Sequence, residues 1–138
     1  MIRFEEVTKR FADGTLAVER LNLDVAAGET VMLVGPSGCG KTTSLRLINR
    51  LEEATSGRIL LDGQDVAKAD ATDLRRGIGY VIQHAGLFPH RRIDANIATV
   101  PRLLGWPRAR IAERVREMLG TVGLDPRLAH RYPHQRSG

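Results

Sequence analysis

The sequence predicts an α/β fold, with a mixed β-sheet around a phosphate-binding loop followed by a helical segment. Three observations lead to this prediction. The stretch from Gly35 to Thr42 matches G-x-x-x-x-G-K-[ST] at every position. Short apolar runs separated by glycine-containing turns fill the chain as far as Ile82. Beyond Gln83 the apolar spacing changes from that of strands to that of a helix.

The N-terminal residues alternate as strands do. One predicted face carries Ile2, Phe4 and Glu6, and the other carries Arg3, Glu5 and Val7. Asp13-Gly14 predicts a turn, and the next strand carries Val18, Leu21, Leu23 and Val25. Ala27-Gly28-Glu29 predicts a second turn, which leads into a buried strand at Thr30–Val34.

The phosphate-binding loop directly follows that strand and precedes a helix expected at Ser44–Leu51, with Leu45, Ile48 and Leu51 on related faces. Glycines let a loop backbone wrap phosphate oxygens, and the helix N-terminus adds partial positive charge. The predicted nucleotide-binding residues are Gly35, Pro36, Ser37, Gly38, Cys39, Gly40, Lys41, Thr42 and Thr43. Lys41 supplies a full charge for the β- and γ-phosphates, and the Thr42 hydroxyl can ligate Mg²⁺.

Two other interpretations of this stretch are disfavoured. A chance match is improbable because strand, loop and helix occur in the required order. A dinucleotide-binding fold requires G-x-G-x-x-G, which Gly38–Thr43 breaks at its last position. We therefore predict ATP and Mg²⁺ as the ligands.

A third run of strand-like residues follows the helix. Thr55-Ser56-Gly57 predicts a break, Arg58–Leu61 a strand and Asp62-Gly63 a tight turn. Ile59–Asp62 imitates a Walker B strand, but Gly63 stands where a glutamate is needed, so the turn is favoured. Another buried strand is predicted at Ile78–Ile82.

The helical segment is clearest after Pro107, which is suited to the first position of a helix. Gly123 is suited to the helix end. The predicted apolar stripe consists of Ile111, Val115, Met118, Leu119 and Val122. We expect a nucleotide-binding core with antiparallel strands at about 1–90 and the start of a helical subdomain at about 91–138.

Composition limits the remaining function classes. The net charge is +5 with a pI near 10.1, but the arginine pairs are scattered and only 4% of residues are aromatic. No nucleic acid is therefore expected as a partner. No membrane span or signal segment is evident, and the single cysteine, Cys39, fits a reducing cytoplasm.

Several stretches together resemble the ATP-binding subunit of ABC transporters. Tyr80–His90 resembles the Q-loop of that family, a strand ending in Gln83 and followed by Leu-Phe-Pro-His. The resemblance implies that Gln83 reaches Mg²⁺ or the attacking water, as a catalytic residue together with Lys41. Phe11 stands where the family places an aromatic that stacks on adenine, although an isolated phenylalanine is more often a core residue.

The resemblance narrows to importers of glycine betaine, choline, carnitine and proline. It rests on Asn96–Trp106, Ile48–Leu51 and Arg131–His134. It implies ATP-driven import, with transmembrane permease subunits, a second ATP-binding subunit and a substrate-binding protein as partners. The implied location is cytoplasmic, peripheral on the inner face of the plasma membrane. Arg92 departs from the threonine usual there, and Asp94 is expected to favour the helix start in its place.

The family pattern also implies that the chain stops within the signature motif. Arg136 replaces its leucine, and Ser137-Gly138 are its last matching residues. Ser137 is expected to face ATP on the opposite subunit. Walker B, the catalytic glutamate and the switch histidine are not among the 138 residues, so two alternatives stay open: a nucleotide-binding fragment without turnover, and a P-loop ATPase acting on nucleic acid. A zinc site at His130 and His134 is disfavoured because Pro133 interrupts a helix between them.

Overall fold

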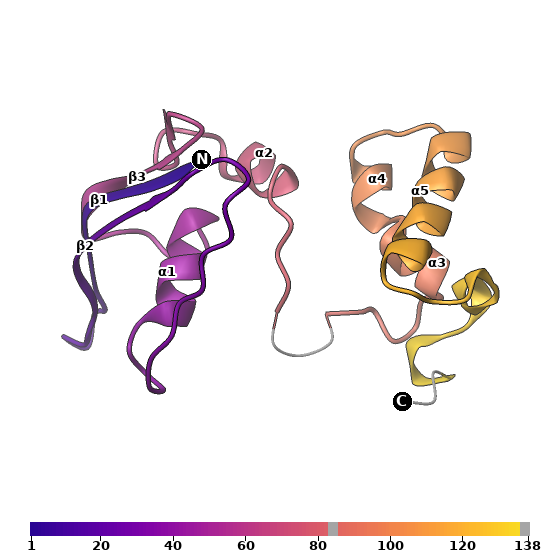
Figure 1. Cartoon of the computed structure of the whole chain (residues 1–138), viewed down its shortest axis with the longest axis horizontal. Helices are drawn as coiled ribbons and strands as arrows, with labels where there is room; N and C mark the ends of the chain where they lie inside the picture. Colours follow the sequence, from indigo (N-terminus) through magenta and orange to yellow (C-terminus); the bar gives the residue numbers. More distant parts are fainter. Residues whose placement is uncertain (83–85, 136–138) are drawn as a thin grey trace. The chain divides into compact units, whose positions relative to one another are not determined.

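A computed structural model describes residues 1–82 and 86–135. The chain divides into two compact units, Met1–Gly79 and Tyr80–Gly138 (Figure 1). The first unit contains all the strands of the described residues, and the second contains only helices. That residues 1–90 form a nucleotide-binding core and residues 91–138 begin a helical subdomain stays a prediction.

The first unit is built on a four-stranded sheet whose neighbouring strands are all antiparallel, so the described residues do not form the mixed sheet predicted from the sequence. Its order is β2-β1-β3-β4. The strands are β1 (Ile2–Arg10), β2 (Leu16–Val25), β3 (Ser56–Leu61) and β4 (Gln64–Asp65). Asp62 and Gly63 both have positive φ, 50° and 83°, as a two-residue hairpin of type I′ requires. This confirms the prediction that Asp62 is a turn residue and not a Walker B acid.

A β-bulge in β1 corrects the predicted alternation. Phe4 pairs with Leu23 whereas Val7 pairs with Leu21, so β1 contains one residue more than β2 over this interval. Glu6 has a positive φ of 47° and lies within the bulge. Phe4 and Val7 are therefore both buried in one core, at 3% and 0% exposure, although the sequence placed them on opposite faces.

Helix α1 (Lys41–Ile48) packs against this sheet (Figure 1). Leu47 is only 1% exposed and joins the core formed by Phe4, Val7, Val18, Ile59 and Val66. The predicted face was partly wrong, because Leu45 is 48% exposed and Leu51 lies beyond the helix. Arg50 has a positive φ of 52°, a conformation that ends a helix.

A second, unpredicted helix follows β4. This helix, α2 (Ala71–Arg76), begins at Asp70, whose side chain accepts hydrogen bonds from the Thr72 and Asp73 amides. These two bonds lower the pKa of Asp70 below its usual value. Asp70 is therefore an N-cap that sequence reasoning passed over.

The strands predicted at Thr30–Val34 and Ile78–Ile82 do not form. A strand is stabilised by a neighbour that receives its hydrogen bonds, and the described sheet pairs neither segment. Thr30–Val34 nevertheless keeps two faces. Val31 and Leu33 line a cavity of about 310 Å³ with α1 and the sheet, whereas Met32 and Val34 are 81% and 86% exposed.

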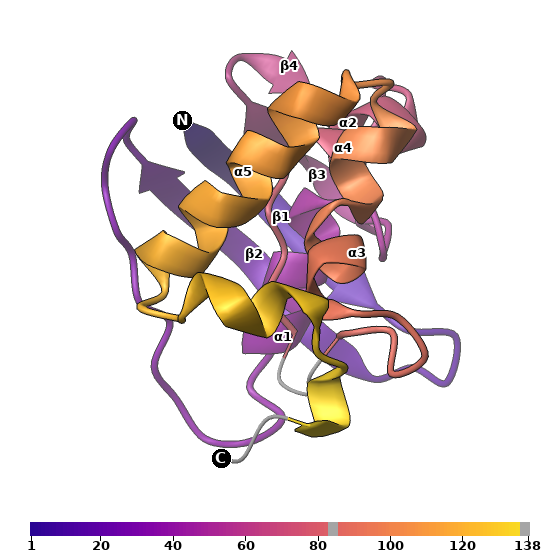
Figure 2. The ribbon, with the colours of Figure 1, turned by 90° about the vertical axis from the view of Figure 1, so that its right-hand side faces the viewer.

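The second unit packs short helices around a long one. They are α3 (Ile93–Ile97), α4 (Thr99–Leu103), α5 (Arg108–Thr121), and the 3₁₀ helices η1 (Pro126–His130) and η2 (Pro133–Gln135). Figure 2 shows α5 running beside α3 and α4. The core consists of Ile93, Ala98, Ile111, Val115, Leu119 and Ala129.

The sequence made predictions about where α5 ends and how α3 begins. Gly123, with φ of 68°, follows α5, and the Leu124 amide donates to the Leu119 carbonyl at 2.8 Å, which confirms the predicted glycine stop. Val122 was wrongly placed in the buried stripe, since it lies beyond the helix and is 66% exposed. Arg92 is the N-cap residue of α3 and makes no side-chain capping bond, while Asp94 accepts from the Ala95 amide.

A search of the described helices finds none that is long and apolar enough to cross a membrane.

The two faces of Thr30–Val34 give a first prediction. In Met32→Lys/Val34→Lys we expect less binding of a hydrophobic dye and less self-association, because these side chains face away from the core. The free energy of unfolding, measured by urea titration, should change by no more than about 0.5 kcal/mol. The matched variant Val31→Lys/Leu33→Lys replaces two apolar side chains that line the cavity and are 38% and 36% exposed, and it should lose about 1–2 kcal/mol. Equal destabilisation of the two variants, by urea titration, would contradict the assigned faces.

Candidate functional site

The phosphate-binding loop ends in two glycines with left-handed backbone. Gly38 has φ of 83° and Gly40 has φ of 88°. Gly40 is also buried, and a Cβ at this position would lie 2.2 Å from the Ala17 carbonyl oxygen of β2. The sequence explains these glycines by the close approach of phosphate alone, whereas Gly40 is also required for the loop to contact the sheet.

Lys41 reaches back over the loop. Its Nζ donates to the carbonyl oxygens of Gly35 and Pro36, both at 2.6 Å, and lies 3.3 Å from Cys39 Sγ. The full positive charge is thus held over the residues that the motif assigns to phosphate. This placement fits a bound anion.

Helix α1 adds further positive charge at the same place. It begins at Lys41, so the amides of its first turn have no carbonyl four residues earlier within the helix. No acidic side chain lies in that first turn to neutralise them. First-turn amides and a helix dipole that point toward a loop favour an anion bound there.

The hydroxyl groups of the site differ in exposure. Thr42 is exposed, Thr43 is half-buried, and Ser44 is buried with its hydroxyl donating to the Gly40 carbonyl at 3.0 Å. Of the three, Thr42 is therefore the most accessible to a metal ion bound with the phosphates. Its residue type fits Mg²⁺, which prefers oxygen ligands.

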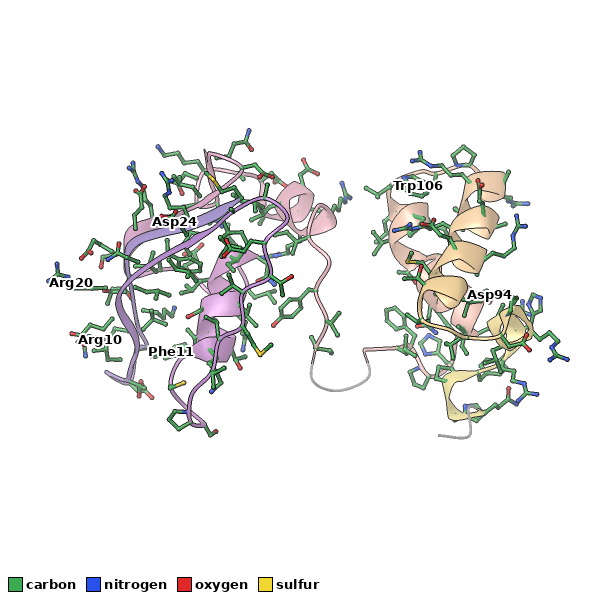
Figure 3. All side chains as sticks on the ribbon, in the orientation of Figure 1. Arg10, Phe11, Arg20, Asp24, Asp94 and Trp106 are labelled. Atoms are coloured by element: carbon green, nitrogen blue, oxygen red, sulfur yellow. The ribbon has the colours of Figure 1, made fainter. Side chains whose placement is uncertain are left out.

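Phe11 follows β1 at the start of a tight turn (Figure 3). Its amide donates to the Thr15 carbonyl at 2.9 Å, and the Lys9 ammonium lies 5.0 Å from the centre of its ring. Phe11 is half-buried and is not part of the buried core cluster. Its proposed stacking on adenine stays a prediction.

Two predicted site residues, Gln83 and Ser137, lie outside the described residues. Their roles stay predictions.

Sequence reasoning missed Arg75, which acts at the far end of the same helix. Its guanidinium donates to the carbonyls of Asn49 and Arg50 at 3.0 and 2.5 Å. A cation at a helix C-terminus satisfies carbonyls that have no partner within the helix. The only signal was the pair Arg75-Arg76, which looked like one of several scattered basic pairs.

The two C-terminal histidines have separate partners. His130 Nδ1 lies 3.2 Å from Asp94 Oδ2, and His134 stacks on Tyr132 with ring centres 5.7 Å apart. Among the residues that the structure describes, no group of three or more His, Cys, Asp or Glu is placed to hold a metal ion.

The loop, its lysine and the helix behind it have the arrangement expected of a P-loop site, and sequence comparison identifies the family. The ABC transporter family profile matches residues 18–138. The chain belongs to the ABC transporter ATP-binding family.

Within that family the chain is similar to proteins of osmoprotectant uptake. It is 50% identical over 138 residues to the glycine betaine/carnitine/choline transport ATP-binding protein OpuCA of Bacillus subtilis. It is also 50% identical over 143 residues to the osmoprotectant import ATP-binding protein OsmV of Salmonella typhimurium. All of this chain is covered in both cases, but only 36% and 37% of the relatives' lengths. The predicted resemblance to the quaternary-amine branch is confirmed.

Solved structures support the same assignment. A dimeric bacterial ABC transporter cassette has a TM-score of 0.87 and 32% sequence identity, covering 100% of this chain and 64% of the cassette. A post-hydrolysis dimer of an ATP-binding cassette bound to ADP and Pi has a TM-score of 0.84 and 30% identity, covering 99% of this chain and 63% of the other. The predicted fold class, the N-terminal part of an ABC ATPase domain, is therefore confirmed.

The two left-handed glycines give a second prediction. Gly40→Ala should destabilise the first unit by about 3 kcal/mol or more, because its Cβ meets backbone and its φ is strained. Gly38→Ala is the matched control, with a similar φ and no atom within 4 Å of the added Cβ. It should cost about 1 kcal/mol. Urea titrations that give the two variants the same stability would show that the Ala17 contact is unimportant.

Proposed function

We propose that this chain provides the ATP-binding part of an ABC importer for osmoprotectants such as glycine betaine. The observation that carries the proposal is the phosphate loop, in which the Lys41 ammonium and the first turn of α1 converge on one place. The similarity to OpuCA and OsmV supports the substrate class, since the names of those proteins specify quaternary amines and osmoprotectants.

The residues divide the work of binding nucleotide. Loop amides and Lys41 hold the phosphates and stabilise negative charge on the transferred phosphoryl group. Thr42 and Gln83 hold Mg²⁺, which neutralises charge on the phosphate oxygens. Phe11 stacks on adenine, and Ser137 contacts the ATP bound by the second subunit.

The proposal includes partners and a location. Paired ATP-binding subunits close on ATP and drive permease subunits that cross the membrane, and a substrate-binding protein delivers the solute. The chain then acts on the cytoplasmic face of the plasma membrane. The dimeric arrangement of the two similar cassettes supports the pairing.

Removal of the Lys41 charge tests the site directly. Lys41→Ala should weaken MgATP binding about tenfold to a hundredfold, as expected for the loss of charged hydrogen bonds to phosphate. Lys68→Ala is the matched control, because it removes the same charge from an exposed position of the same unit. Titration with a fluorescent ATP analogue measures both. Equal affinities for the wild type and Lys41→Ala would show that this loop is not the site.

Steady turnover is not expected from these 138 residues alone. Phosphoryl transfer depends on a residue that orients the attacking water, and the glutamate that the family uses is not in this sequence. Phosphate release by the purified chain should equal that of Lys41→Ala. Turnover that Lys41→Ala abolishes would refute this expectation and make the chain an ATPase by itself.

A further inference from the structure

Residues 86–92 lead directly into α3 and make few stabilising contacts among themselves. All seven residues are exposed, including Phe88 at 44%. The only hydrogen bond within the segment joins the Arg91 amide to the Phe88 carbonyl, at 3.1 Å. A segment with so little buried surface and so few internal hydrogen bonds is expected to be flexible unless contacts with other residues fix it.

The Asn96 side chain, on α3, holds this segment. Its Oδ1 accepts from the Phe88 amide at 2.7 Å. Its Nδ2 lies at donating distance from the carbonyls of Phe88, Arg91 and Arg92, at 3.1, 3.1 and 3.0 Å. The half-buried Asn96 side chain thus lies within hydrogen-bond distance of both backbone groups of Phe88 and of two carbonyls further along, which its two N–H groups share.

Backbone hydrogen bonds also tie the C-terminal end of this segment to the helical unit. The Asn96 amide donates to the Arg92 carbonyl, and the Ile93 amide donates to the Arg131 carbonyl, both at 2.9 Å. The Arg91 guanidinium lies 4.8 Å from the centre of the Phe88 ring, and His90 meets that ring edge-on. Residues 88–92 are therefore fastened to α3.

We propose that Asn96 is a positioning residue that makes Phe88–Arg92 a rigid extension of α3. The only covalent route from the nucleotide-binding unit to α3 passes through residues 80–92. A displacement that arrives along this route moves the helical unit if the last residues are rigid, and is absorbed if they are flexible. Asn96 thereby allows nucleotide binding to be transmitted to α3, an inference that rests on the proposed function.

Amide hydrogen exchange, resolved by residue, tests the clamp itself. In the wild type the Phe88 amide should be protected. In Asn96→Ala its exchange should accelerate by about tenfold or more, while amides of α5 keep their rates. Unchanged protection of Phe88 in Asn96→Ala would overturn the clamp.

Addition of MgATP tests transmission. In the wild type we expect exchange in α3 and α4 to change by about threefold, and in Asn96→Ala this response should vanish while ATP affinity stays within about twofold. Thr99→Val is the matched control, because it removes a hydrogen bond to the Ala95 carbonyl without touching residues 86–92. It should keep the response. Loss of the response in Thr99→Val as well would indicate general loosening and overturn the specific role of Asn96.

Asn96→Asp keeps the test decisive if Asn96→Ala unfolds the helical unit. It retains an acceptor for the Phe88 amide and loses the Nδ2 donor that faces the carbonyls of Phe88, Arg91 and Arg92. The Phe88 amide should stay protected, while the change in exchange caused by ATP should fall by about twofold or more. A full response in Asn96→Asp would overturn the proposal. A wild type that binds no ATP would refute the proposed function and transmission together, whereas protection of Phe88 would still decide the clamp.

Discussion

The burial of Leu47 against the antiparallel sheet is the contact on which the nucleotide site depends. Helix α1 has eight residues, too few to be stable in isolation, so it persists because of packing. Leu47 is 1% exposed among the side chains of β1, β2 and β3. Burying a leucine contributes about 1.5–3 kcal/mol. Because the phosphate loop is continuous with this helix, the position of the loop amides depends on apolar packing near the opposite end of α1.

Contacts outside the apolar core fix the two ends of the same helix. At the N-terminal end Gly40 lies against the Ala17 carbonyl, so β2 limits how far the loop can move. At the C-terminal end Arg75 binds the carbonyls of Asn49 and Arg50, which links α1 to α2. The helix is thus held at three places, by a glycine contact, an apolar side chain and a guanidinium. Substitutions well outside the loop can therefore weaken nucleotide binding by displacing α1.

Features that depend on local chemistry could be predicted from the sequence, and those that depend on distant partners could not. The loop and the Asp62-Gly63 hairpin follow from glycine positions and motif spacing. The bulge at Glu6 does not, because its amide is bound by the Asn22 side chain at 2.9 Å and its carboxylate by Arg20 at 2.7 Å. Thr30–Val34 has the composition of a strand, yet composition supplies no neighbour to pair with it. In the helical unit, the spacing placed Ile111, Val115 and Leu119 in the core correctly, but the glycine stop left Val122 outside.

The Lys41 contacts bear on what the loop selects. Its ammonium already donates to two carbonyl oxygens. The binding free energy that a ligand gains from Lys41 is therefore the difference between the new hydrogen bonds and the displaced ones. A neutral oxygen would gain little by this exchange. A phosphate oxygen gains more, because its negative charge adds Coulomb attraction to a hydrogen bond that the ammonium already strengthens. The first-turn amides of α1 add to the same preference. In the proposed ATP site, selection for a multiply charged phosphate chain therefore comes from charge, and a ligand must bind Lys41 more strongly than the carbonyls of Gly35 and Pro36 do.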